Sequence, residues 1–345
     1  MPAVSAIIPM RSTREPFMPT VSVVIPNYNH QRFLRKRIES VLQQTYQDFE
    51  LILLDDCSTD DSRSILSQYV DDPRVRLEFN DVNSGSTYKQ WNKGVRLARG
   101  KYLWIAESDD YADEEFLERL VRILENDYTV AYAYCRSWHV TADDQLQGFH
   151  DNYGPYQGPR GWATDYRVDG RQECRDYFLF MNPVSNASAA VFRKSAYELV
   201  GGADESLIVC GDWKLWASVA LTGHIAYLSK PLNYYRSHEA TQRTRTSRRL
   251  VSVVEGLQVV RWILDRMELS EAESTAVYKS HAGNWVPALM SLRVPLDAKR
   301  EILRCAMAVD PHPTRRMLAP AIETVRLSLL RRWRSVRAPY PEASS

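Results

Sequence analysis

The sequence predicts an α/β fold with a mostly parallel sheet and helices on both of its faces. Two observations lead to this prediction. Short apolar runs alternate with segments of about 10–15 residues whose apolar side chains recur at helical spacing. In addition, acidic turns directly follow two of the apolar runs, as expected for ligand-binding loops at the carboxyl ends of parallel strands. The chain of 345 residues can hold one large domain, or one domain with an appendage.

The regular alternation begins after a short N-terminal segment. Residues 1–17 contain a near-duplicate of the first strand, so we expect them to be an extension; an additional edge strand is the alternative. Apolar runs predict strands at residues 21–26, 49–54, 74–79 and 102–106. Helical spacing predicts helices at residues 31–44, 60–70, 86–99 and 113–125, the third one capped by Gly100.

The rest of the chain is less regular and then becomes helical. Residues 141–170 are rich in Gly, Asp, Tyr and Pro, which predicts a long irregular loop. Residues 250–345 have helical patterns throughout. Within them, residues 313–337 combine apolar side chains at helical spacing with seven arginines, typical of a basic amphipathic helix on a membrane surface. Packing of this helix on its own domain or on a second subunit is the alternative.

Composition excludes several classes of protein. A net charge of +1 gives no reason to expect binding to nucleic acid. The five cysteines are scattered without a CxxC motif, which indicates reduced thiols rather than a disulfide framework. No apolar stretch reaches the roughly 18 residues of a membrane span, and no signal peptide is recognisable. We therefore expect a cytoplasmic protein, peripheral on the inner face of the cell membrane if the basic helix binds there.

The acidic turns at residues 55–56 and 107–110 indicate a metal and phosphate site. Adjacent carboxylates repel each other unless a cation neutralises them. Oxygen ligands without a nearby Cys or His cluster favour Mg²⁺ or Mn²⁺, ions that often bridge to phosphates. The chain has neither GxGxxG nor GxxxxGK[ST], so a dinucleotide-binding fold and a P-loop are not predicted. A solvated acidic turn before a helix is the alternative interpretation.

Four motifs together resemble a known enzyme family. They are Val21-Ser-Val-Val-Ile-Pro-Asn-Tyr-Asn29, Ser40-Val-Leu-Gln-Gln-Thr-Tyr46, Asp55-Asp-Cys-Ser-Thr-Asp60 and Glu107-Ser-Asp-Asp110. In order and spacing the chain resembles the inverting glycosyltransferases of family two, which have the GT-A fold, a Rossmann-like nucleotide-binding sheet flanked by helices. The segment 88–110 resembles the branch that builds bacterial O-antigens and other surface polysaccharides. The resemblance implies a GT-A domain at residues 18–240 and a helical C-terminal region at 241–345.

The resemblance implies a role for each residue of the donor site. Pro26 and Tyr28 match the loop that packs on the nucleotide base and ribose. Asp56 matches the aspartate that accepts the base N–H, and a carboxylate suits the N3–H of uracil or thymine, so UDP- or dTDP-sugars are favoured. Asp110 matches the carboxylate that binds the divalent metal, Mn²⁺ or Mg²⁺. Asp109 matches its neighbour, which contacts the ribose or water on the metal.

Further positions complete the implied donor site. Glu107 departs from the family, because many relatives have aspartate there, and its part in metal binding stays open. Lys89 stands where a cation contacts the donor, although an ordinary surface lysine is an equally good interpretation. The element Tyr234-Tyr-Arg-Ser-His238 matches a family motif in which Arg236 contacts the phosphates and His238 the metal or the diphosphate.

The acceptor side is implied by two further segments. Asn186 and Ser188 resemble the floor of the acceptor site and would hydrogen-bond sugar hydroxyls, or make a structural turn. Asp212 matches the aspartate that acts as catalytic base, needed because a sugar hydroxyl is a poor nucleophile until its proton is removed. An N-cap aspartate is the alternative for Asp212. Trp213 would offer an apolar face to a sugar ring, or belong to the core.

The sequence therefore predicts a metal-dependent inverting glycosyltransferase. Its donor would be a nucleotide-sugar, and its acceptor a glycan or a lipid-linked glycan in bacterial surface polysaccharide synthesis. A sugar nucleotidyltransferase is a weaker alternative, because the first loop lacks the required glycines and lysine. A non-catalytic GT-A-like binding or scaffold protein is the other alternative.

Overall fold

The computed structural model describes residues 18–150, 158–184, 186–239 and 249–314. The predicted extension at residues 1–17 lies outside the described residues, as does nearly all of the basic helix predicted at residues 313–337.

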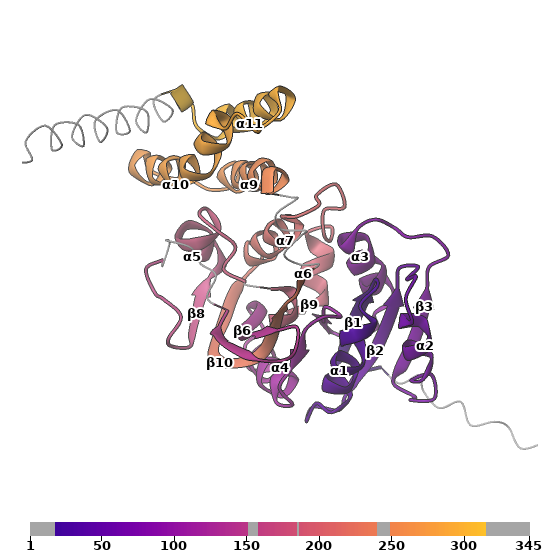
Figure 1. Cartoon of the computed structure of the whole chain (residues 1–345). Helices are drawn as coiled ribbons and strands as arrows, with labels where there is room; N and C mark the ends of the chain where they lie inside the picture. Colours follow the sequence, from indigo (N-terminus) through magenta and orange to yellow (C-terminus); the bar gives the residue numbers. More distant parts are fainter. Residues whose placement is uncertain (1–17, 151–157, 185, 240–248, 315–345) are drawn as a thin grey trace, which may run out of the picture.

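The first half of the chain forms the predicted parallel sheet (Figure 1). Strands β1 (Val21–Asn27), β2 (Phe49–Asp55), β3 (Val75–Phe79) and β4 (Tyr102–Ile105) are arranged in the order β3-β2-β1-β4. All three neighbouring pairs are parallel. Because β2 and β3 lie on one side of β1 and β4 on the other, the chain reverses its direction of winding between β1 and β4. Open α/β sheets bind ligands at such a switch point.

The second half of the chain extends the sheet with mixed pairing. Next to β4 the order continues β9-β6-β10-β5, where only the pair β6–β10 is parallel. The loop predicted at residues 141–170 contains two of the added strands, so it is less irregular than expected. The bounds are β5 (Tyr111–Ala112), β6 (Val130–Thr141), β7 (Leu146–Phe149), β8 (Tyr166–Asp169), β9 (Ala190–Arg193) and β10 (His224–Ser237).

Two apolar layers cover the two faces of the sheet. Alternate residues of β1 divide between them: Val23 and Ile25 face one layer, and Val24 faces the other. The first layer is formed by α1 (Gln31–Leu42), α2 (Ser62–Ser67) and α4 (Phe116–Asn126). The second is formed by α3 (Thr87–Leu97), α6 (Lys194–Leu199) and α7 (Gly211–Ala220). Short helical turns lie at α5 (Gly170–Glu173), Cys174–Phe178 and Ala187–Ala189.

Helix boundaries differ from the prediction where tertiary contacts intervene. Helix α4 begins at Phe116 rather than at residue 113, because Tyr111–Ala112 pairs with β10. Helix α3 ends at Leu97 with Ala98 as its C-cap, so Gly100 is not its cap. A Cβ at Gly100 would lie 2.6 Å from the backbone nitrogen of Ser22, so the glycine allows close approach to β1.

Three helices confirm the helical prediction for residues 249–309. They are α9 (Arg249–Leu264), α10 (Glu271–Met290) and α11 (Leu296–Val309), and we call them the helical region. Helix α9 lies beside α7 (Figure 1), and all three helices bury apolar side chains in the same layer as α3 and α7. Among the helices that the structure describes, none is both long and apolar enough to cross a membrane.

Candidate active site

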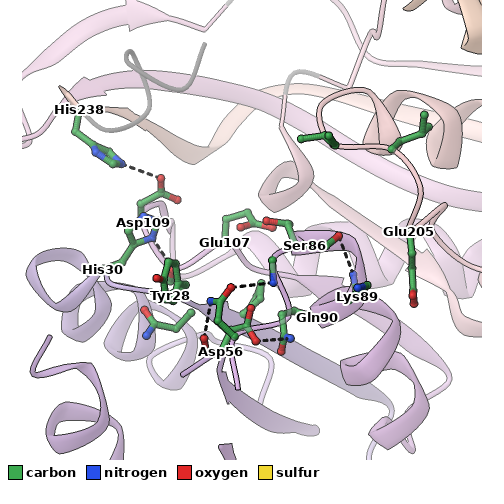
Figure 2. Close-up of a pocket in the computed structure, with 18 residues that line it drawn as sticks. Tyr28, His30, Asp56, Ser86, Lys89, Gln90, Glu107, Asp109, Glu205 and His238 are labelled. Atoms are coloured by element: carbon green, nitrogen blue, oxygen red, sulfur yellow. Dashed lines mark hydrogen bonds and ion pairs between the residues drawn. The ribbon is translucent and has the colours of Figure 1, made fainter. Parts of the chain in front are cut away.

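A pocket of about 680 Å³ opens at the carboxyl ends of β1, β2 and β4. Its walls come from the turn after β1, the first residues after β2, the start of α3 and the acidic loop 107–109 after β4 (Figure 2). The segment preceding α7 and the end of β10 close it. Both acidic turns therefore meet at the sheet edge where the sequence predicted them, at the switch point between β1 and β4.

Asp56 is fixed in this pocket by a dense set of hydrogen bonds. Its Oδ1 accepts from Asn80 Nδ2 at 2.6 Å, from the backbone N–H of Ser84 at 2.9 Å and from Gln90 Nε2 at 2.9 Å. Its Oδ2 accepts from Ser84 Oγ at 2.7 Å. The carboxylate is buried but lines the pocket, so its orientation is set before any ligand binds. An oriented acceptor of this kind suits a base N–H.

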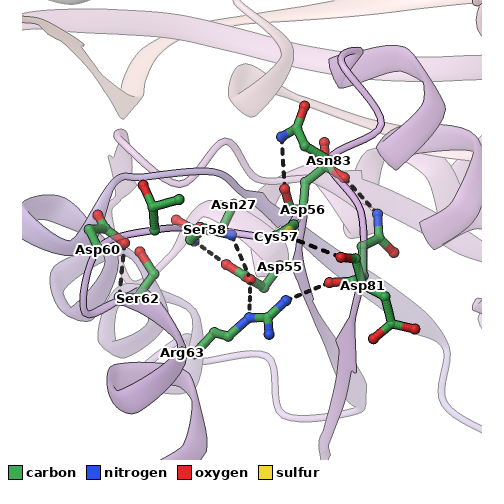
Figure 3. Close-up of polar contacts among 12 residues, drawn as sticks. Asn27, Asp55, Asp56, Cys57, Ser58, Asp60, Ser62, Arg63, Asp81 and Asn83 are labelled. Atoms are coloured by element: carbon green, nitrogen blue, oxygen red, sulfur yellow. Dashed lines mark hydrogen bonds and ion pairs between the residues drawn. The ribbon is translucent and has the colours of Figure 1, made fainter.

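The neighbouring Asp55 has a structural role instead (Figure 3). Its carboxylate accepts from Asn27 Nδ2 at 3.0 Å, from the backbone N–H of Ser58 at 3.0 Å and from Arg63 Nε at 2.8 Å. Burial alone would raise the pKa of Asp55, but the bonds from Arg63 and Ser58 outweigh it and lower that pKa. Asp55 thus ties the loop after β2 to β1, while Asp56 faces the pocket.

Asp109 and two histidines form a cluster that fits a divalent cation. One ligand atom from each of His30, Asp109 and His238 lies within 4.8 Å of the others. His238 Nε2 is 3.1 Å from Asp109 Oδ2, and His30 Nδ1 is 2.8 Å from Ser108 Oγ. All three residues line the pocket (Figure 2). His30 is not among the site residues predicted from the sequence, although its place directly after the turn that follows β1 is a signal for this sheet edge.

Asp110 and Arg236 lie outside the pocket, contrary to the expected metal and phosphate contacts. Asp110 is 3% exposed, and its Oδ1 accepts the backbone N–H of Arg236 at 2.9 Å. The guanidinium of Arg236 donates to the carbonyl of Asp109 at 2.7 Å and pairs with Asp144 at 2.6 Å. Both side chains therefore hold the acidic loop against β10 and the β6–β7 hairpin, and neither lines the pocket.

Buried charges surround the acidic loop. Burial, and then the charge of Asp109, raise the pKa of Glu107 to about 8 and that of Asp110 to about 7. Glu107 accepts from Trp91 Nε1 at 2.7 Å. The buried Arg37 donates from Nε to the carbonyl of Glu107 at 2.8 Å, so a positive charge lies beneath the carboxylates. From the sequence, Arg37 is predicted only as part of the helix at residues 31–44.

Three predicted donor residues line the pocket as expected. Pro26 and Tyr28 come from the end of β1 and the turn after it, and Tyr28 is 47% exposed, leaving its ring available for stacking. Lys89 lines the wall formed by α3, where its Nζ donates to the carbonyl of Ser84 at 3.4 Å. Their contacts with a nucleotide-sugar stay predictions.

Asp212 lies in the first turn of α7, beyond the pocket wall. Cys210 occupies the N-cap position, so Asp212 is not the helix cap. Its Oδ2 accepts from Asn182 Nδ2 at 3.1 Å and its Oδ1 from the N–H of Trp213 at 2.7 Å. Burial raises the pKa of Asp212 to about 6, a value suited to a general base near neutral pH. The segment just before it contributes Leu207 to the pocket.

The predicted acceptor residues are more structural than expected. Ser188 is fully buried, and its Oγ accepts the backbone N–H of Glu107 at 3.0 Å, so it supports the acidic loop. Trp213 donates from Nε1 to the carbonyl of Phe178 at 3.0 Å, and its ring lies near His281 of the helical region. Asn186 accepts from Asn233 Nδ2 at 3.2 Å, and among the described residues its own Nδ2 has no partner.

Comparison with known sequences places these features in one family. Residues 22–198 match the family described as glycosyl transferase family 2. An uncharacterised glycosyltransferase of Haemophilus influenzae is 28% identical over 64% of this chain and 66% of its own length. The putative teichuronic acid biosynthesis glycosyltransferase TuaG of Bacillus subtilis is 36% identical over 31% of this chain and 42% of its own length. The chain spans about half or less of the length of the first curated relatives it matches.

Solved structures show the same fold. TarS of S. aureus, residues 1–349 in complex with UDP-GlcNAc, matches with a TM-score of 0.63 and 18% identity, over 85% of this chain and 82% of the other. Mannosyltransferase PcManGT of Pyrobaculum calidifontis, in complex with GDP-Man and Mn²⁺, matches with a TM-score of 0.52 and 16% identity, over 93% and 83%. These similarities confirm the predicted GT-A fold. Since the family match covers more than half of the chain, the protein belongs to glycosyl transferase family 2.

Proposed function

We propose that this protein transfers a sugar from a nucleotide-sugar donor to a hydroxyl of a glycan or lipid-linked glycan, with inversion at the anomeric carbon. One observation supports this proposal above all others. A single pocket at the switch point of the sheet joins the oriented carboxylate of Asp56 to the cluster of His30, Asp109 and His238. The carboxylate suits a nucleotide base, and the cluster suits a diphosphate that is bound through a cation.

The donor would lie along this pocket with its base near β2 and its diphosphate near the acidic loop. Asp56 would accept the base N–H, a contact that a uracil or thymine N3–H provides. The exposed ring of Tyr28 would stack on the base, with Pro26 beside it. Lys89, on the α3 wall, would approach the phosphates or the sugar as a mobile point charge.

The mixed donor set of two imidazoles and one carboxylate fits a first-row divalent ion, and we propose Mn²⁺ ahead of Mg²⁺. Asp109, His238 and His30 would hold it, rather than Asp110. When bound, such an ion neutralises charge on the leaving diphosphate. The hydrogen bond between His30 Nδ1 and Ser108 Oγ fixes the ring of His30, as supporting contacts of metal ligands commonly do.

Asp212 would take the proton of the acceptor hydroxyl as that oxygen attacks the anomeric carbon. One displacement by this oxygen forms the new glycosidic bond and breaks the bond to the diphosphate, which inverts the centre. Asn182 holds the carboxylate of Asp212 in place, and burial keeps its basicity high. Arg236 acts indirectly, since its guanidinium fixes the carbonyl of Asp109.

The names of two relatives support a class of acceptor. TuaG is named for teichuronic acid biosynthesis, and the putative glycosyl transferase WcaA of Escherichia coli for colanic acid biosynthesis. We propose that this protein likewise acts in bacterial surface polysaccharide synthesis. A lipid-linked acceptor would agree with attachment of residues 313–337 to a membrane surface, which their sequence predicts.

The test combines binding with turnover. Calorimetry with UDP, dTDP and GDP, each with and without Mn²⁺, should show tight binding of one nucleotide that depends on the ion. Transfer to water or to an added acceptor should then be measured with sugars of that nucleotide, and the anomeric configuration of the product determined by NMR. Retention of configuration, or nucleotide binding without any transfer or hydrolysis, would contradict the proposal.

Asp109→Ala should abolish the effect of Mn²⁺ on nucleotide binding, because the cluster loses its carboxylate. Asp71→Ala is the matched control, since Asp71 is exposed and distant from the pocket lining. Full activity of Asp109→Ala, or of the wild type in EDTA, would contradict the metal assignment.

A further inference from the structure

Glu255 of α9 is a buried carboxylate that binds the backbone of the segment leading to Asp212. It is 6% exposed. Its Oε1 accepts the N–H of Ile208 at 2.8 Å, and its Oε2 accepts those of Val209 and Cys210, each at 2.8 Å. Three consecutive amides thus point at one carboxylate from the helical region, outside the segment that matches the family.

The amide of Cys210 stands at the N-cap of α7, where backbone N–H groups have no partner within the helix, and those of Ile208 and Val209 directly precede it. The next one, of Gly211, donates to the phenolic oxygen of Tyr88 at 2.9 Å, and Tyr88 donates to the carbonyl of Val209 at 3.0 Å. Side chains of α3 and α9 together therefore fix the backbone from Ile208 to Gly211. This segment lines the donor pocket at one end and carries Asp212 at the other.

We propose that Glu255 is a positioning residue for the transfer reaction, which makes the helical region part of the catalytic unit. It holds the segment 208–210 so that α7 presents Asp212 in one direction while Ile208 keeps its place in the donor pocket. This inference rests on the proposed function, because it takes Asp212 as the base. A displacement of about 1 Å at such a position costs up to roughly 100-fold in rate.

Glu255 also influences the base electrostatically. Burial is the main cause of the raised pKa of Asp212, and the negative charge of Glu255 raises it further. Tyr88 of α3 and Cys210 also face Asp212, whose negative charge raises the pKa of each of them. Burial raises the pKa of both, so neither carries charge near pH 6. Removing the charge of Glu255 should therefore lower the pKa of Asp212.

The experiment uses the full chain with Glu255→Gln, Glu255→Asp and the control Glu271→Gln, whose side chain is exposed in the first turn of α10. Glutamine keeps the shape of the glutamate side chain, but its N–H₂ group would face one of the backbone N–H donors of residues 208–210. We expect Glu255→Gln to lower kcat roughly 10- to 100-fold. In a plot of kcat against pH, the fall of kcat on the acid side (the acid limb) should also move to lower pH. Glu255→Asp, which keeps the charge, should leave the limb near its wild-type position. Glu271→Gln should match the wild type.

Failure of the inference and failure of the function give different results. A wild type that transfers sugar, with Glu255→Gln equal to it in kcat and in pH profile, overturns the inference alone. A wild type without transfer or hydrolysis overturns the function. Hydrogen exchange reports on the contact without any turnover: amides 208–210 should exchange faster in Glu255→Gln than in Glu271→Gln. Equal exchange overturns the inference.

Discussion

Asp212 and Asp56 have different surroundings, which suit the different tasks proposed for these two aspartates. Asp56 receives four hydrogen bonds, which fix its carboxylate in the pocket as an acceptor. Asp212 receives one side-chain hydrogen bond, from Asn182, and burial raises its pKa to about 6. A group with a raised pKa is a stronger base once it is ionised, and at neutral pH it is still largely ionised. This supports assigning binding to Asp56 and proton transfer to Asp212.

The pH dependence of the reaction follows from this pKa. Because Asp212 must be ionised to accept a proton, activity should be complete above about pH 7 and should fall about tenfold per pH unit below about pH 6.

Asp212→Asn should lower kcat about 10²–10⁴-fold and leave nucleotide binding unchanged. Steady-state kinetics from pH 5 to 8 and calorimetry on the variant check both results. A variant with normal turnover would assign the base to another group, and Glu205, which lines the pocket, would be tested next.

At the scale of residues, the acidic turns could be predicted from the sequence better than the individual residues within them. The acidic turns at residues 55–56 and 107–110 were expected at the site because they follow strands of one parallel sheet, whereas the roles of Asp56 and Asp109 came from the family resemblance. Which of Asp109 and Asp110 faces the pocket depends on the N–H of Arg236, a contact between residues more than 120 positions apart. The burial of Ser188 under the acidic loop is likewise a tertiary property. Such contacts leave no local pattern in the sequence.

At the scale of elements, apolar runs predicted the strands of the parallel sheet well, because buried strands need continuous apolar side chains. The added strands were not predicted. Strand β5 has only the residues Tyr111–Ala112 and exists through its pairing with β10. Gly100 was assigned to a cap because glycine is common there, but its actual constraint is the backbone of β1.

Gly100→Ala should therefore destabilise the protein. The new Cβ would lie 2.6 Å from Ser22 N and 2.7 Å from the carbonyl carbon of Val21, so a backbone shift is needed. Overpacking of this kind costs about 1–3 kcal/mol. Gly283→Ala, in helix α10 with no atom within 4 Å of the new Cβ, is the control and should stabilise by up to about 1 kcal/mol. Thermal unfolding of both variants measures the difference, and equal melting temperatures would contradict the close approach.

At the scale of the whole molecule, the helical region is continuous with the sheet domain. Val260, Ile263 and Trp285 lie in the same apolar layer as α3 and α7, and Glu255 joins the two parts through buried hydrogen bonds. The predicted boundary near residue 240 therefore does not separate two apolar cores. The boundary was placed where the family resemblance ends, but which apolar faces meet depends on the folded arrangement.

Residues 315–345 follow the described helices and carry seven arginines against two glutamates, a net charge of +5. A chain ending at Thr314 should keep the melting temperature and transfer activity of the full chain toward a water-soluble acceptor. It should lose binding to vesicles that contain anionic lipid, since each basic residue near such a surface contributes about 1 kcal/mol. Sedimentation with phosphatidylglycerol vesicles, compared with pure phosphatidylcholine, measures the effect.

Charge and apolar contact can be separated within the same tail. Replacing Arg331, Arg332 and Arg334 by serine keeps the apolar positions Leu329, Trp333 and Val336 but removes three charges. If electrostatic attraction brings the tail to the membrane, this variant should bind anionic vesicles more weakly, and raised salt should have the same effect on the wild type. Replacing Trp333 by serine should instead weaken binding that persists at high salt, because the helical spacing of the sequence assigns Trp333 to the predicted apolar face. Unchanged sedimentation of the truncated chain, together with a lower melting temperature, would show that the tail packs on the protein.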